Sequence, residues 1–169
     1  MEPTAQSYTC PSCGQTHTGL PTDIGYTLPD DVWAIPEDER GLLAKWTTDL
    51  CQLGERYFIR CLVKIPFRDR LGYFGLGLWA EVTWPVFDRY NQTYDCDGSL
   101  EPVHSGKLAN QPPGYDKTVG VEISIKFGSS TERPTIHFPL DATCLLSLEQ
   151  TNGIDYTRYH DILETNGSL

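Results

Sequence analysis

The sequence has few positive charges for its length and no long apolar run. Thirteen Lys and Arg residues stand against 23 Asp and Glu residues in a chain of 169, which gives a formal net charge of −10. Because nucleic-acid phosphates are bound by clustered Lys and Arg, this balance argues against a nucleic-acid partner. The longest apolar stretch, residues 71–80, is interrupted by three glycines. It is about half of the ~20 residues that a membrane-spanning helix needs, so we expect no membrane partner.

Motifs that mark common enzyme classes are also missing. The chain contains no G-x-S-x-G, no phosphate-binding glycine loop and no H-E-x-x-H. Residues 1–6 include neither the basic nor the apolar part of a secretory signal. Six cysteines could form three disulfides, but without an export signal reduced thiols are the better expectation. The sequence therefore predicts a cytoplasmic protein.

What the sequence does contain suits one folded domain. Hydrophobic residues make up 39% of the chain and aromatic residues 11%, which is too much for a disordered protein. The length lies within the roughly 100–200 residues that are usual for one domain. We therefore expect a single domain over residues 1–169.

Strands are predicted where apolar and polar residues alternate at period two. Residues 57–65 and 119–127 show this alternation, and residues 73–82 form an apolar, glycine-rich strand. A turn at residues 128–130 leads to a partner strand at 135–138, which predicts a hairpin.

Helix signals occur at three places. Acidic residues after Pro36 suit the first turn of a helix that carries Leu42, Leu43 and Trp46. Thr83 and Asp155 are plausible caps of two further helices, and residues 95–117 read as a long loop. The expected fold class is α+β: a mainly antiparallel sheet of four or five strands, with two or three helices packed on one face and an N-terminal Cys-x-x-Cys knuckle at residues 8–21.

The knuckle suggests a structural zinc ion. Cys10 and Cys13, three positions apart and followed by a glycine, can place two sulfurs on one tetrahedral ion. His17 and Cys51 are the candidate remaining ligands. A vestigial site, a reversible disulfide and free thiols are alternative interpretations of the pair, whereas its setting does not favour a thioredoxin-type redox function.

Four residues near strand ends and the predicted loop are candidates for a binding surface. They are polar or aromatic, and binding groups gather in such places: Arg60, Trp79, Asn110 and Tyr115. The structural alternative is that Arg60 pairs with an acid and that Trp79 fills the core.

An ordered set of short motifs covers most of the chain. In chain order the motifs are Cys10-Pro-Ser-Cys13-Gly14, His17, Gly19-Leu20-Pro21, Asp49-Leu50-Cys51, Tyr57-Phe58-Ile59-Arg60, Ile65-Pro66, Gly77-Leu78-Trp79, Leu108-Ala-Asn-Gln-Pro-Pro-Gly114-Tyr115, Arg133-Pro134, Leu148-Glu149-Gln150 and Gly153-Ile154. This set resembles a bacterial family known as domain of unknown function 2199. The resemblance implies a small cytoplasmic bacterial domain without an established activity, with a zinc knuckle to whose pattern Cys51 belongs.

Three classes of function fit these observations. The first is a non-enzymatic module that binds a basic protein, for example in an immunity or antitoxin-like role, because a charge of −10 would speed encounter with a cationic partner. The alternative is a small hydrolase or transferase that depends on a metal or a thiol at the Cys10–Cys13 end, which would require an open coordination position and a cleft. The third is a zinc-stabilised structural domain with an unknown small ligand.

Overall fold

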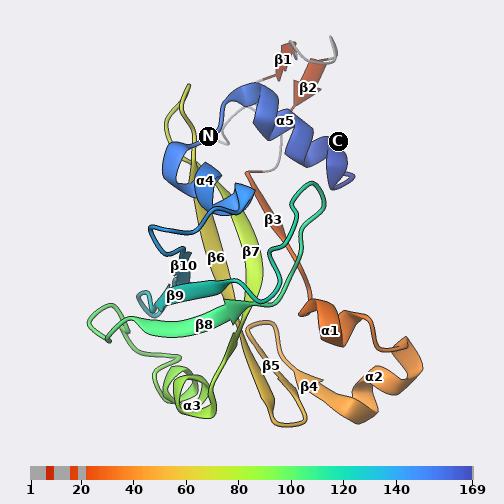
Figure 1. The fold of residues 1–169 in the computed structure, drawn as a ribbon, viewed down its shortest axis with the longest axis vertical. Helices are drawn as coiled ribbons and strands as arrows, with labels where there is room; N and C mark the ends of the chain where they lie inside the picture. The colour runs from red at the N-terminus through yellow and green to blue at the C-terminus, as the bar shows by residue number, and fades with distance from the viewer. Residues whose placement is uncertain (1–6, 10–15, 19–21, 169) are drawn as a thin grey trace, which may run out of the picture.

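Five strands close into a mixed β-barrel (Figure 1). The computed structural model describes residues 22–168 and the backbone of residues 7–9 and 16–18. Neighbouring barrel strands are antiparallel except where β10 returns to β6 in the parallel sense. In order around the barrel the strands are β6 (Arg56–Pro66), β7 (Tyr73–Val82), β8 (His104–Leu108), β9 (Glu122–Lys126) and β10 (Thr135–His137).

Three further strands extend the sheet outside the barrel. β6 is longer than its neighbour β10, and β7 is longer than its neighbour β8. The parts of β6 and β7 that these short strands leave uncovered pair with further strands. β3 (Asp23–Gly25) runs parallel to β7, β5 (Leu50–Leu53) runs antiparallel to β6, and β4 (Ala44–Trp46) pairs with β5 as an edge strand. A separate antiparallel pair consists of β1 (Ser7–Thr9) and β2 (Thr16–Thr18).

The barrel interior is filled by the inward face of each strand. Ile59, Cys61, Val63 and Ile65 of β6 are fully buried, as the period-two alternation predicts. The predicted strand at 73–82 is confirmed with the same ends, and the predicted hairpin is confirmed as the antiparallel pair of β9 and β10.

Within the described residues, five helices lie at the two ends of the barrel and to one side of it, rather than together on one face of the sheet. Figure 1 shows α4 (Leu145–Asn152) and α5 (Tyr156–Thr165) at one end, α3 (Trp84–Gln92) at the other, and α1 (Asp30–Trp33) and α2 (Glu37–Leu43) projecting to the side. The side chain of Asp155 accepts a hydrogen bond from Arg158 N at 2.9 Å, which confirms the predicted cap of the last helix. None of the helices in the described part of the chain is both long and apolar enough to cross a membrane.

The α+β class is correct and most strand pairs are antiparallel, but the main sheet over residues 22–168 has eight strands rather than four or five, and five of them close into a barrel. The sheet closes because β10 pairs with β6, a parallel contact between distant segments that local patterns do not reveal. The predicted loop at 95–117 contains β8. The sequence of β8 is mostly polar and lacks the apolar alternation from which a strand is predicted. Gly106 of β8 has to be small, since a Cβ there would lie 2.8 Å from Ile125 Cδ1 and 2.9 Å from Glu81 O.

Candidate functional site

Trp79 and Asn110, two of the candidate surface residues, are buried and bonded to each other. Trp79 is fully buried; its backbone N donates to Asn110 Oδ1 at 2.7 Å, and its indole Nε1 donates to Tyr26 O at 2.8 Å. Asn110 Nδ2 donates to Leu28 O at 3.0 Å and to Asp30 Oδ1 at 2.8 Å. Asn110 therefore connects β7 to the segment that leads into α1, and neither residue is exposed.

Tyr115 is also buried rather than exposed. Its hydroxyl donates to Glu149 Oε2 at 2.5 Å, and Arg158 Nε donates to Glu149 Oε1 at 2.5 Å. The Arg158 guanidinium lies 5.2 Å from the centre of the Tyr115 ring. These three residues join the 95–117 segment to α4 and α5. Tyr115 therefore stabilises the fold and does not form part of an exposed surface.

Most of the four predicted zinc ligands lie outside the residues that the structure describes. Cys10 and Cys13 are outside the described residues, and so is the side chain of His17. Cys51 is buried on β5, where burial raises the pKa of its thiol to about 11 and favours the neutral form. The zinc site stays a prediction.

A second, smaller core supports the segment from α1 to β4, which we call the arch (residues 30–46). Val32 of α1 is fully buried, and Ala44 at the start of β4 is 4% exposed. Both pack into a cluster separate from the barrel interior, together with Leu28, Cys51, Phe58, Trp79 and Ala109. The arch is thus anchored at both ends.

Between these anchors α2 buries none of its own side chains. Leu42 is 85% exposed and Leu43 is 55% exposed, and Trp33 and Trp46 are exposed in the same segment. Arg40 holds the arch in shape, because its Nη2 donates to Trp33 O at 2.9 Å and to Ile35 O at 3.1 Å. The predicted helix after Pro36 is confirmed, but its leucines face outward and Trp46 belongs to β4.

Most charged side chains of the arch are acidic; its two cations are Arg40, which donates to backbone carbonyls, and Lys45, which is exposed on β4. Asp30 is used by Asn110, and Asp31 pairs with Arg56 at 2.9 Å. Glu37, Asp38 and Glu39 are exposed in the first turn of α2 and have no ion pair within residues 22–168. The arch therefore presents apolar side chains beside three unpaired carboxylates.

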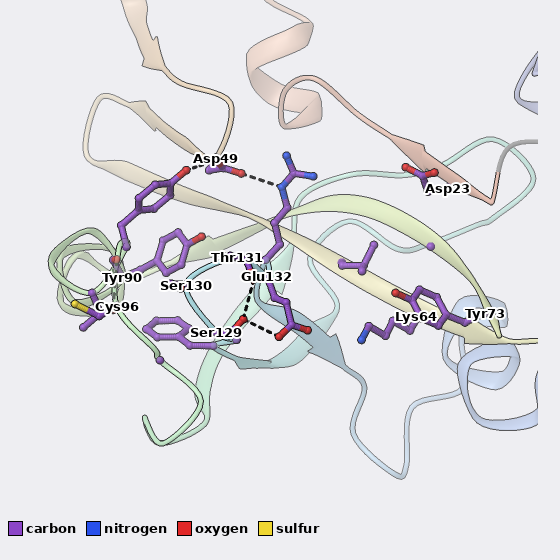
Figure 2. A pocket seen from close by; sticks show the side chains of 18 of the residues that line it. Asp23, Asp49, Lys64, Tyr73, Tyr90, Cys96, Ser129, Ser130, Thr131 and Glu132 are labelled. Carbon is purple, nitrogen blue, oxygen red and sulfur yellow. Dashed lines mark hydrogen bonds and ion pairs between the residues drawn. The ribbon is translucent and has the colours of Figure 1, made fainter. Parts of the chain in front are cut away.

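A groove of about 670 Å³ lies on the outer face of the sheet, between β6–β7 and the turn at residues 128–133 (Figure 2). Much of its lining carries hydroxyl groups, from Thr22, Tyr73, Tyr90, Thr93, Tyr94, Ser129, Ser130 and Thr131. Lys64 and Arg133 are its cations, and Asp23, Asp49 and Glu132 are its carboxylates.

Both carboxylate oxygens of Asp49, which lines the groove, already accept hydrogen bonds from the protein. Arg133 Nε donates to Asp49 Oδ1 at 2.8 Å, and the Tyr94 hydroxyl donates to Asp49 Oδ2 at 2.5 Å. Burial alone would raise the pKa of Asp49, but the hydrogen bonds from Arg133 and Tyr94 and the charges of Arg133 and Arg60 outweigh it, so that the pKa is lowered.

Arg60 adjoins the groove and is the one predicted surface residue that remains partly exposed. Its Nη1 donates to Thr48 O at 3.4 Å, and its buried Nε has no partner among the described residues. Burial and the neighbouring charge of Arg133 lower the pKa of Arg60, against the opposing effect of Asp49. The expectation that Arg60 pairs with an acid is not met within residues 22–168.

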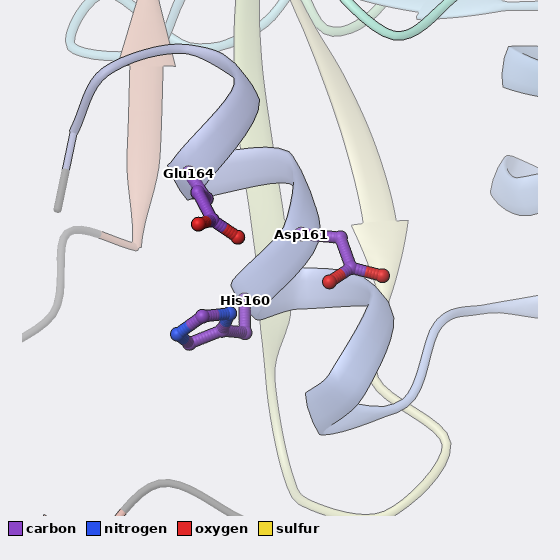
Figure 3. A group of neighbouring side chains, drawn as sticks. All are labelled: His160, Asp161 and Glu164. Carbon is purple, nitrogen blue, oxygen red and sulfur yellow. The ribbon is translucent and has the colours of Figure 1, made fainter. Parts of the chain in front are cut away.

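One cluster on α5 resembles a metal site in composition. His160, Asp161 and Glu164 offer ligand atoms that all lie within 4.8 Å of one another, and Figure 3 shows them on neighbouring turns of the helix. His160 is buried and the two acids are exposed. Exposed carboxylates on neighbouring turns are common without a metal, so the cluster does not establish a metal site.

The sequence contained a signal for the groove. Arg60 and Lys64 fall on the same polar face of the predicted strand at 57–65, which places them together.

Comparison with known proteins gives one match. Residues 9–154 match the family described as an uncharacterized protein conserved in bacteria (DUF2199). No curated protein matches the chain, and no solved structure does. The match covers the whole barrel, the arch and the groove, and it confirms the resemblance drawn from the ordered motifs: the chain belongs to the DUF2199 family of bacterial proteins.

Proposed function

We propose that this protein is a non-enzymatic binding module whose arch docks a basic, amphipathic segment of a partner protein. The observation that carries the proposal is α2, a helix that buries none of its residues and exposes two leucines. Adjacent exposed leucines on a helix gain free energy when another surface covers them. The arch is also preformed, because Val32 and Ala44 anchor it in the second core.

Charge specifies the chemistry of the partner. Glu37, Asp38 and Glu39 flank the leucines without an ion pair among the described residues, and the whole chain has a net charge of −10. Lysine or arginine beside apolar side chains complements this surface, and the long-range field would accelerate the encounter. Neutralisation of a basic toxin, as immunity proteins and antitoxins do, is one specific form of this function.

The size of the apolar contribution follows from the exposed fractions. Burying a whole leucine side chain stabilises a complex by roughly 1.5–3 kcal/mol. Leu42 and Leu43 together expose somewhat more than one leucine, and part of that gain is offset by the ordering of the interface. Removing both should therefore weaken binding at least roughly tenfold, which corresponds to about 1.4 kcal/mol.

The test is fluorescence anisotropy with a labelled peptide of about 14 lysines and leucines arranged as an amphipathic helix. Leu42→Ser/Leu43→Ser should weaken binding, whereas Leu71→Ser, at an exposed leucine outside the arch, should not. A peptide of the same composition with its leucines scattered around the helix should bind more weakly than the amphipathic one. Equal binding of the two peptides, or of the two variants, would reject the arch as the docking site.

A further inference from the structure

The groove on the outer face of the sheet shows features of a second, independent site. Its floor includes bare backbone, since Gly75 of β7 lies between Asp23 of β3 and Lys64 of β6 in register. Two residues further along β3 and β7, Gly25 pairs with Gly77, and Gly77 also pairs with Leu62 of β6. The three glycines have no side chains of their own, and neighbouring side chains pack over them: a Cβ at Gly75 would lie 3.0 Å from Leu62 Cδ1.

Arg60 reaches across this glycine floor. A Cβ at Gly25 would lie 2.4 Å from Arg60 Nη2, and a Cβ at Gly77 would lie 3.8 Å from Arg60 Nε. The guanidinium therefore rests on β3 at the level of Leu62, about 7 Å along the strands from the level of Lys64. A residue larger than glycine at position 25 would displace the guanidinium.

Two cations at this place are left without an acid. Neither Arg60 nor Lys64 forms an ion pair within the described part of the chain, although the protein has many more acids than bases. The Lys64 ammonium lies 4.9 Å from the centre of the Tyr73 ring, and Figure 2 shows both beside the groove. A half-buried arginine with an unsatisfied Nε is costly unless an anion compensates it.

Other lining residues suit hydroxyl groups. Ser129, Ser130 and Thr131 also line the groove, and Asp23 provides a carboxylate that can accept hydrogen bonds. Glu132 is held by the Ser129 hydroxyl at 2.8 Å, and Asp49 is held by Arg133. Among the described residues that line the groove, the cation without an ion pair is therefore Lys64, and Asp23 and Glu132 are carboxylates without one; Arg60 is a second unpaired cation that adjoins the groove without lining it.

We infer that the groove binds a small phosphorylated, hydroxyl-bearing molecule such as a sugar phosphate, with its phosphate on Arg60 and Lys64 and its hydroxyls on Asp23 and the 129–131 turn. A phosphate carries close to two negative charges at pH 7 and offers three acceptor oxygens, which matches two unpaired cationic donors. This site is separate from the arch and does not depend on the proposed protein-binding function.

Isothermal titration calorimetry with ribose 5-phosphate, inorganic phosphate, ribose and citrate tests the inference. Ribose 5-phosphate should bind most tightly, inorganic phosphate more weakly, and ribose and citrate least. Arg60→Gln and Lys64→Gln should each weaken binding of ribose 5-phosphate roughly tenfold, since each removes a charge-assisted contact. Lys107→Gln, an exposed cation outside the groove, should leave it unchanged.

Gly25→Ala supplies a variant that keeps every charge. Its Cβ would displace the end of the flexible Arg60 side chain rather than the backbone, so the fold should survive while binding weakens. Thermal unfolding of each variant checks that it is folded. Failure of ribose 5-phosphate to bind, binding unchanged in Arg60→Gln and Gly25→Ala, or tighter binding of citrate would each overturn the inference.

Discussion

Asn110→Ala should destabilise the protein strongly, although the residue lies in a segment without a predicted strand or helix. The side chain is 1% exposed and connects Trp79 N, Leu28 O and Asp30 Oδ1. Its loss leaves the buried N–H of Trp79 and the carbonyl of Leu28 without their partner, and each orphaned group costs about 1–3 kcal/mol. We therefore expect a loss of about 4 kcal/mol, a large part of the 5–15 kcal/mol that holds a typical domain together.

Urea unfolding at neutral pH measures this loss, with an unchanged m-value as evidence that the same surface is exposed. Asn91→Ala, at an exposed position of α3, is the matched control and should change the free energy of unfolding by less than about 0.5 kcal/mol. A loss below about 1 kcal/mol for Asn110→Ala would refute the role of this side chain as the connection between barrel and arch.

The remaining predictions concern a charge, the thiols, the metal and a buried hydroxyl. The folded-state pKa of Asp49 is lowered, so its stabilising contribution is present above the unfolded pKa of about 3.9 and is lost as pH falls through the lower folded value; the difference in Tm between wild type and Asp49→Asn should shrink over that range. Iodoacetamide at neutral pH should label exposed Cys96 in the folded protein but not Cys51 or Cys61, which peptide mapping will show, and equal labelling of all three would contradict their burial. Protein purified without an affinity tag should contain about one zinc per chain, lost in Cys10→Ser, and elemental analysis without zinc would reject the knuckle as a metal site. Tyr115→Phe should cost about 1.5–3 kcal/mol in urea unfolding, since it removes a buried hydrogen bond to a carboxylate, and no cost would show that Glu149 finds another donor.

The strands and helices with strong local periodicity were predictable from the sequence. The alternation at 57–65 placed Ile59, Cys61 and Val63 inside, and Asp155 marked the start of the last helix. These signals are local, because side-chain direction and capping depend on neighbours within one or two turns.

Closure of the barrel and the polar strand β8 were not predictable in this way. β8 pairs through its backbone and presents His104, Ser105 and Lys107, so it lacks an apolar alternation. Three of the four candidate surface residues, Trp79, Asn110 and Tyr115, are buried for a related reason: polar and aromatic groups near strand ends also form buried connections. Only tertiary contacts distinguish Asn110, which is buried, from Arg60, which adjoins a groove.

Hydrogen–deuterium exchange with and without the amphipathic lysine–leucine peptide tests the docking surface most directly. If the arch binds a basic apolar segment, the peptide should slow exchange in residues 37–46, and Leu42→Ser/Leu43→Ser should abolish that protection while the barrel strands exchange as before. Protection that appears outside the arch, or that persists in the double variant, would contradict the proposed function.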